Sequence, residues 1–273
     1  LNKNDLFPSL NMKYQMNEKN SLRFAFSRTV TRPSFIEMAP FLYQESYGSA
    51  QIRGNADLQN GYNYNIDLRY ELFEKNGDML SITAYYKHLK APIERVQTLS
   101  GGSAVHSFRN ADNGMATGVE IEFRKEIVKD LRFGVNGSYM YTNVKLPEGG
   151  AYTNSQRALQ GASPYLANAD LTYSPAFSND RQLSVALLYN LQGPRIHSVG
   201  ISGLGDIKQQ PVHTLNFTGS YRFNRRFAVK LQVNDLLNQD ILFKQEVPTT
   251  GDKVEVERFR KGTGFEVGFS YDL

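Results

Sequence analysis

Arginines and aromatic residues in the stretches without a regular pattern are the side chains with the clearest capacity for chemistry. A guanidinium group binds carboxylates and phosphates through paired hydrogen bonds, and an aromatic face attracts cations and stacks on flat rings. Together these groups suit the capture of anionic or catechol-like chelates and of sugars, although an ordinary solvated loop is the simpler interpretation for any single residue. The candidate ligand-binding residues are Tyr43, Tyr47, Arg53, Arg109, Tyr152, Arg157, Arg195 and His197.

Signals for covalent catalysis or metal binding are weak in this sequence. The chain has no cysteine, which excludes a disulfide, a thiolate metal site and a cysteine nucleophile. Its 4 histidines show no metal-ligand spacing. The pairs Glu120/Glu122 and Glu255/Glu257 would each place two carboxylates on one face of a strand, but a polar lining is a simpler interpretation than a catalytic dyad. We therefore expect no catalytic residue, no metal and no cofactor.

A period of two dominates the elements that must hold the candidate residues. From Tyr62 to Leu72 every second side chain is apolar, and the side chains between them are polar or charged. An α-helix would spread both kinds around its circumference, so this alternation indicates a strand with one apolar face. The segment from Phe265 to Leu273 repeats the pattern.

The alternation predicts an all-β antiparallel fold in one unit, without a helix of ten residues or more. No linker, low-complexity tract or change of composition divides the chain. We expect eleven strands, near residues 9–17, 21–30, 61–73, 78–96, 114–127, 131–145, 164–174, 182–196, 211–224, 226–237 and 262–273.

The connections between these strands alternate strictly between short and long. Short connections rich in Asn, Asp and Gly are typical of tight hairpins. Soluble sandwiches rarely sort their loops in this way, whereas outer-membrane barrels have short periplasmic turns and long extracellular loops. The long connections are expected near residues 31–60, 97–113, 146–163, 197–210 and 238–261.

Strand length favours a transmembrane β-barrel over a soluble β-sandwich, whose apolar face would be its core. A barrel strand needs about 9–11 residues, and a membrane-spanning helix needs about 20 apolar residues. The longest unbroken apolar run here is only residues 185–189. Tyrosines gather near strand ends, as at the headgroup level of a membrane. The net charge of +4 is scattered, so no nucleic-acid partner is expected.

Several motifs, in this order along nearly the whole chain, resemble the C-terminal half of the barrel of a TonB-dependent outer-membrane receptor, of the kind common in Bacteroidetes. We take Arg32–Pro33 and Asn55 within them as structural. The last residue, Leu273, departs from the aromatic residue usual in that family. The matching stretches are Phe26-Ser27-Arg28-Thr29-Val30-Thr31-Arg32-Pro33, Gly54-Asn55-Ala56-Asp57-Leu58, Gly118-Val119-Glu120, Ser163-Pro164-Tyr165-Leu166-Ala167-Asn168 and Val233-Asn234-Asp235-Leu236-Leu237-Asn238.

The resemblance implies a 22-stranded barrel with a plugged lumen, of which eleven strands are half. Residues 1–273 would be the C-terminal part of this barrel, with the plug domain and the N-terminal strands outside the chain. The implied function is uptake of a siderophore, haem, vitamin or oligosaccharide across the Gram-negative outer membrane. The implied partners are membrane lipid, the imported ligand, and the TonB complex acting on the plug. A structural or adhesive barrel without transport is the main alternative, and a lipase-like barrel enzyme is a further one.

Overall fold

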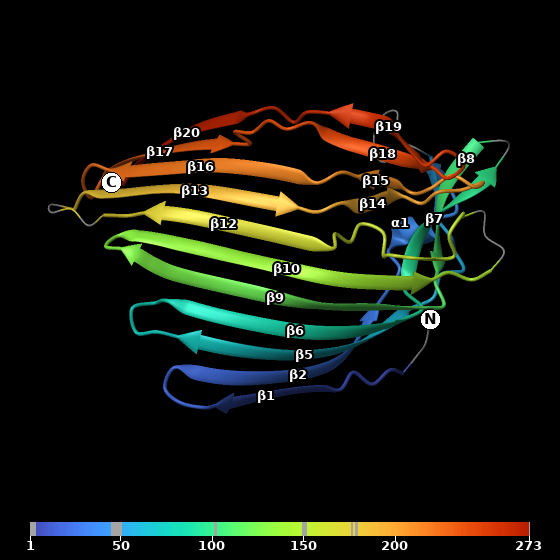
Figure 1. The fold of residues 1–273 in the computed structure, drawn as a ribbon, viewed down its shortest axis with the longest axis horizontal. Helices are drawn as coiled ribbons and strands as arrows, with labels where there is room; N and C mark the ends of the chain where they lie inside the picture. The colour runs from blue at the N-terminus through green and yellow to red at the C-terminus, as the bar shows by residue number, and fades with distance from the viewer. Residues whose placement is uncertain are drawn as a thin grey trace.

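Eleven long strands of the computed structural model lie side by side in chain order, each antiparallel to its neighbours (Figure 1). A short twelfth strand, β11, pairs with β10 beside this path. The structure describes residues 4–44, 51–100, 103–148, 152–175, 177 and 180–272. The predicted all-β antiparallel fold is confirmed. The eleven strands are β1 (Ser9–Gln15), β2 (Asn20–Thr31), β5 (Gly61–Phe73), β6 (Met79–Lys90), β9 (Asn113–Val128), β10 (Leu131–Lys145), β12 (Tyr165–Tyr173), β13 (Gln182–Gln192), β16 (Val212–Arg222), β17 (Phe227–Asn234) and β20 (Gly264–Tyr271).

The connections are sorted by length, as predicted: the short turns lie at one end of the sheet and the long segments at the other (Figure 1). Asparagine side chains close two of the turns. The Asn17 side-chain oxygen accepts hydrogen bonds from the backbone of Lys19 and Asn20, and Asn224 does the same for Arg226 and Phe227. These side chains satisfy backbone groups that the sheet leaves unpaired, so the turns need few residues.

Two of the expected strands end four or more residues before their predicted ends. The expected strand 78–96 stops at Lys90, because Ala91 has a φ of 51° and Pro92 has no backbone N–H to donate. The expected strand 182–196 stops at Gln192, where Gly193 and Pro194 follow. In both places the chain continues as a strand of another sheet. The apolar pattern in the sequence is continuous across each break, so it does not show that the chain leaves the long sheet for another one.

The long connections fold into a structure of their own, which we call the loop cap (Figure 1). It contains two four-stranded sheets, in the orders β3-β4-β8-β7 and β14-β15-β18-β19. None of the helices in the described ranges has the length and apolar character needed to cross a membrane. The elements of the loop cap are α1 (Phe35–Met38), β3 (Leu42–Tyr43), β4 (Ile52–Arg53), β7 (Ile93–Ser100), β8 (Ser103–Asn110), β11 (Gln156–Arg157), β14 (Arg195–Ser198), β15 (Ile207–Gln209), β18 (Ile241–Val247) and β19 (Asp252–Phe259).

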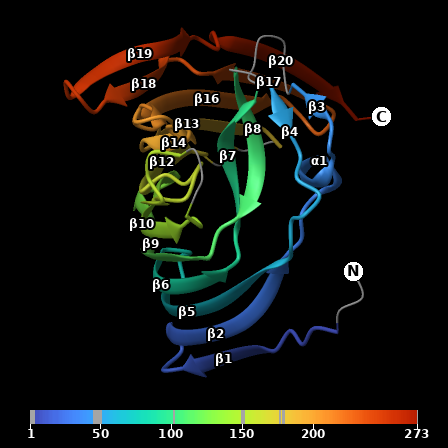
Figure 2. The same cartoon turned by 90° about the vertical axis from the view of Figure 1, so that its right-hand side faces the viewer.

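The long sheet is curved, and the β7–β8 hairpin stands on its concave side (Figure 2). Val144 of β10 packs in a buried cluster with Val96 of β7, so the even-numbered side chains of β10 point into the concavity. Asn136 and Ser138 belong to this set, which makes the polar face the inner face. The odd-numbered side chains, including Tyr139, point outward.

The apolar side chains of the long sheet are largely exposed on its convex face. Leu68, Ile121 and Tyr139 are 47%, 48% and 64% exposed. The most completely buried apolar side chains, Ile52 and Leu146, lie instead in the loop cap. A soluble sandwich would show the reverse arrangement, so the structure supports an apolar face that meets lipid.

Candidate functional site in the loop cap and on the inner face

Three of the candidate residues lie on the β3-β4-β8-β7 sheet of the loop cap. Tyr43 on β3 meets the ring of Phe41 edge-on, with the centroids 6.1 Å apart. Arg53 on β4 is exposed, and Arg109 on β8 is half-buried opposite Glu94 of β7. Two of the candidate arginines and an aromatic pair therefore lie at the loop end of the molecule.

Arg157 and Arg195, which are far apart in sequence, line the same cavity of about 390 Å³. Arg157 is buried on β11, and its Nε and Nη2 atoms have no hydrogen-bond partner among the described residues. Arg195 lies on β14 and donates through Nε to Oε1 of Gln209 at 2.7 Å. Lys208 and Asp206 also line the cavity, so three cations and one carboxylate surround it. The arrangement can bind an anionic group.

A buried ion pair joins the two halves of the loop cap. Arg157 Nη1 lies 2.9 Å from Glu94 Oε2, and both side chains are more than nine-tenths buried. Burial raises the pKa of the Glu94 carboxyl, and the positive charge of Arg157 opposes that rise. Nearby, Gln97 of β7 donates a side-chain hydrogen bond to Ser198 of β14. The β7–β8 hairpin is thus attached to two different loops.

The remaining candidates have local roles or lie outside the described residues. The exposed His197 packs edge-on against Phe243, with ring centroids 4.7 Å apart, and its carbonyl accepts a hydrogen bond from Gln160. Tyr152 packs against the buried cluster that contains Val96. Tyr47 lies outside the described residues. All eight candidates remain predictions as ligand-binding residues.

Sequence reasoning did not select Glu94, Asp206 or Lys208, although each lies beside a selected arginine. Glu94 meets Arg157 only through a contact between residues far apart in sequence, and Asp206 lies outside any strand, just before β15, so no local pattern marks either of them. No signal in the sequence marks Lys208, because β15 has only three residues, which is too few to show a period. Across the described part of the chain, no three His, Asp or Glu side chains come together as metal ligands would.

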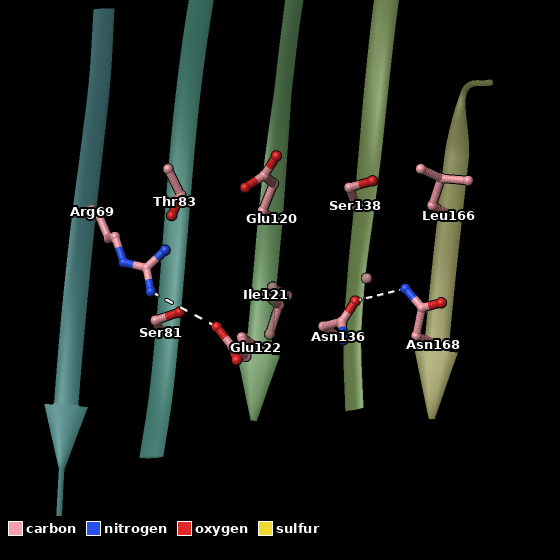
Figure 3. A pocket seen from close by; sticks show the side chains of 11 residues that line it. Arg69, Ser81, Thr83, Glu120, Ile121, Glu122, Asn136, Ser138, Leu166 and Asn168 are labelled. Atoms are coloured by element: carbon pink, nitrogen blue, oxygen red, sulfur yellow. Dashed lines mark hydrogen bonds and ion pairs between the residues drawn. The ribbon is translucent and has the colours of Figure 1, made fainter. Parts of the chain in front are cut away.

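The inner face of the long sheet carries a second polar surface, with a cavity of about 350 Å³ (Figure 3). Glu120 and Glu122 line it, as expected for a polar lining. Arg69 reaches across to Glu122, with Nη2 and Oε2 3.8 Å apart. Asn168 donates to Asn136 at 2.7 Å on the next strand. This surface carries both charged groups and amides.

An ion network ties the inner face together toward the turn end. Glu71 is 5% exposed and accepts hydrogen bonds from Arg23 at 2.7 Å and from Arg69 at 2.9 Å. Ser21 donates a third hydrogen bond to the same carboxylate. With its charge paired in this way, Glu71 is satisfied inside the wall, which leaves the outward face free to be apolar.

The motif at residues 54–58 has a structural role, as expected for Asn55. The Asn55 side chain donates to the carbonyl of Phe108 on β8, and its backbone N–H donates to Glu37 of α1. A Cβ at Gly54 would lie only 2.3 Å from the carbonyl oxygen of Ala39, so only glycine fits there. The motif therefore fastens α1 to the loop cap.

A curved antiparallel sheet with an apolar convex face and a polar, ion-paired inner face is the wall of a transmembrane β-barrel. The chain belongs to the outer membrane protein beta-barrel family, whose model matches residues 1–271. It is accordingly a protein of the Gram-negative outer membrane. The turn end then faces the periplasm, and the loop cap faces the outside.

Known proteins with similar sequences and structures include siderophore receptors. The ferric enterobactin receptor of Pseudomonas aeruginosa is 22% identical over 253 residues, which covers 85% of this chain and 33% of that receptor. The structure of a mutant of that receptor in complex with enterobactin matches with a TM-score of 0.67 at 21% identity, over 97% of this chain and 40% of that chain. The siderophore receptor PirA from Acinetobacter baumannii gives 0.65 at 16% identity, with coverage of 97% and 40%. The chain spans less than half the length of these relatives, and the structural likeness establishes the fold.

Proposed function

We propose that this chain is part of an outer-membrane receptor of the TonB-dependent kind that imports a scarce nutrient. The observation that carries the proposal is the cation-lined cavity between the loop cap and the loop end of β10, in a chain with a polar inner wall. The cavity provides a place to capture a solute, and the wall provides a polar path across the membrane. The similar proteins named above are receptors, which agrees with binding and transport and not with catalysis.

Among siderophores, haem, vitamins and oligosaccharides, an anionic ferric chelate fits the cavity best. Arg157, Arg195 and Lys208 line it against the single carboxylate of Asp206. The unpartnered N–H groups of Arg157 would donate to a negatively charged oxygen, as guanidinium groups do. The names of the similar receptors refer to ferric enterobactin and to siderophores, which supports the same class.

The proposal includes a larger assembly than the described chain. Eleven strands in chain order are half of a 22-stranded receptor barrel, and strands β1 and β20 end the order. In this arrangement the chain is the C-terminal part of the barrel, of the Bacteroidetes type, and a plug domain contributed by the rest of the receptor contacts TonB. The inner polar face would line the path once the plug moves.

The test is uptake of radioactive iron as ferric enterobactin by cells that carry the receptor gene or its deletion. Uptake is expected to require both the gene and the proton gradient. The double variant Arg195→Ala/Lys208→Ala is expected to weaken binding by tenfold or more, because it removes two charges from the cavity. Lys75→Ala/Arg226→Ala, at the turn end, is the control and should bind normally.

The alternatives predict other results. If the protein is a structural or adhesive barrel, deletion of the gene would leave iron uptake unchanged. Uptake of other ferric chelates, haem, vitamins and oligosaccharides, measured in the same way, would also be unchanged. A lipase-like barrel would hydrolyse ester substrates in detergent. If deletion of the gene abolishes uptake but both double variants bind ferric enterobactin equally well, the protein is a receptor whose binding site is not this cavity.

A further inference from the structure

The outward face of the long sheet changes character at its loop end. The register places Lys90 of β6, Asn113 of β9 and Lys145 of β10 side by side in one row. These residues share the outward face with Tyr86 and Tyr141, which lie four residues along the same strands. Both lysines are exposed. The apolar convex face therefore ends in a row with a cation on each side of an amide.

The lysine row lies at the depth of lipid headgroups. Asn113 is eight residues from Ile121, which is at the middle of β9. Eight residues of a strand tilted by about 40° rise about 20 Å along the membrane normal, while half of the hydrocarbon layer is about 15 Å thick. The row is thus just beyond the acyl chains, on the external side of the membrane.

A groove of about 470 Å³ lies on the outward face, separated from this row by the row that contains His88 and Met115. Its floor is formed where small side chains, Ala84 and Thr117, lie between larger ones. Tyr86 borders it on one side, and Tyr139 and Tyr141 border it on the other. The groove runs over Thr117 and Val119 of β9, the strand that also carries Asn113, and on the outward face of that strand only Met115 separates the groove from Asn113.

The two lysines are available to bind an anion. Neither has an ion-pair partner within the ranges that the structure describes. Asp112, which precedes Asn113 in the sequence, donates its backbone N–H to the carbonyl of Lys145, but its carboxylate pairs with neither lysine in the described residues. Because two strand spacings separate Lys90 from Lys145, their Cα atoms are about 10 Å apart, and their flexible side chains can converge on one group.

We propose that this face binds a phosphorylated acyl lipid of the outer leaflet. An acyl chain lies in the groove over Ala84 and Thr117, and a phosphate lies between Lys90 and Lys145 with Asn113 as a hydrogen-bond donor. Basic residues beside a membrane surface attract anionic headgroups, and a pair in one row fixes the position of the phosphate. The proposal rests on the outer-membrane location and not on the transport function.

The test is native mass spectrometry of the receptor, in the length that the cell makes, in detergent with diphosphoryl lipid A. The variant Lys90→Gln/Lys145→Gln is expected to lower the lipid-bound fraction at least tenfold. The control, Lys13→Gln/Lys87→Gln, removes two lysines of the inner face and should bind like the unchanged protein. Equal lipid binding by the two double variants would overturn the proposal.

Two further arms separate the headgroup from the acyl chain. Lipid A without its phosphates is expected to bind weakly to the unchanged protein and equally weakly to Lys90→Gln/Lys145→Gln. Ala84→Leu/Thr117→Leu fills the groove and is expected to reduce binding of lipid A while both lysines remain. Retention of full lipid A binding by this variant would contradict the groove as the acyl site, and heat-modifiable migration on gels confirms that each variant is folded.

Discussion

At the level of single residues, the buried ion pair formed by Glu94 and Arg157 joins two segments of the loop cap. Charged groups lose favourable hydration when they are buried, so each partner is tolerable only in the presence of the other. Arg157 had been selected from the sequence as an isolated cation. Its partner could not be predicted, because Glu94 lies on a hairpin that approaches Arg157 only after the whole sheet has curved.

Removal of one partner of this pair should loosen the β7–β8 hairpin. Arg157→Met leaves the Glu94 carboxylate buried without a counter-charge, which costs about 3–5 kcal/mol. Hydrogen exchange of residues 93–110 should then become much faster. Glu94→Leu/Arg157→Met replaces both charges and should restore most of the protection.

The exposed pair formed by Lys19 and Glu74 provides the control. Their side chains are 47% and 39% exposed, and the variant Lys19→Met should cost less than about 1 kcal/mol. Equal exchange rates for residues 93–110 in Arg157→Met and in Lys19→Met would show that the buried pair does not hold the hairpin.

At the level of elements, the β18–β19 hairpin is held by charge at its open end. Asp240, just before β18, pairs with Arg258 and Arg260 at the end of β19. The hydrogen bond from Arg260 holds the pKa of Asp240 below its ordinary value near 3.8, and the charges of Arg260 and Arg258 act in the same direction. A carboxyl whose pKa is lower in the folded state than in the unfolded state stabilises the folded state at pH values above its pKa in the unfolded state. This stabilisation is lost as the pH falls through the pKa of the folded state.

The hairpin should therefore open in acid. Glu246 and Lys253 face each other across it, and the chain has no native cysteine, so spin labels on Glu246→Cys and Lys253→Cys can report their separation. The distance distribution is expected to be narrow at pH 6 and to broaden as the pH falls below about 4. Arg258 also holds the pKa of Glu255 on β19 below its ordinary value, so the pH dependence should largely vanish when Asp240→Asn and Glu255→Gln are both added. Labels at Ser184 and Ser220, which face each other in the long sheet, should stay close at every pH.

The long strands could be predicted from the sequence, and the short ones could not. Eight or more alternating residues define a strand with one apolar face, so β5 and β20 follow directly from their side chains. Strands such as β4 and β15 contain too few residues to show a period. Proline and glycine at Ala91–Pro92 and Gly193–Pro194 are turn signals in the sequence. The apolar residues that follow them nevertheless favour the prediction of continuous strands.

At the level of the whole molecule, the long sheet has its apolar side chains on the outside and its polar side chains on the inside, which is the reverse of a soluble protein. Neighbouring residues of β9 can test this arrangement. Ile121 points outward and Glu120 points inward. The chain has no tryptophan, so Ile121→Trp and Glu120→Trp each add the only one in this segment. In vesicles of lipids with brominated acyl chains, fluorescence of the first should be strongly quenched and that of the second should hardly change. Equal quenching would contradict the outward orientation of the apolar face.

Each long strand pairs only with the strands next to it in the chain, and this has an evolutionary consequence. Duplication or deletion of one turn-linked pair of strands would change the circumference by about 10 Å and leave every other register intact. Such a wall can gain or lose strands two at a time, and each added pair of strands brings its own external loop. Changes in pore width and changes in ligand preference can therefore arise together from a single genetic event.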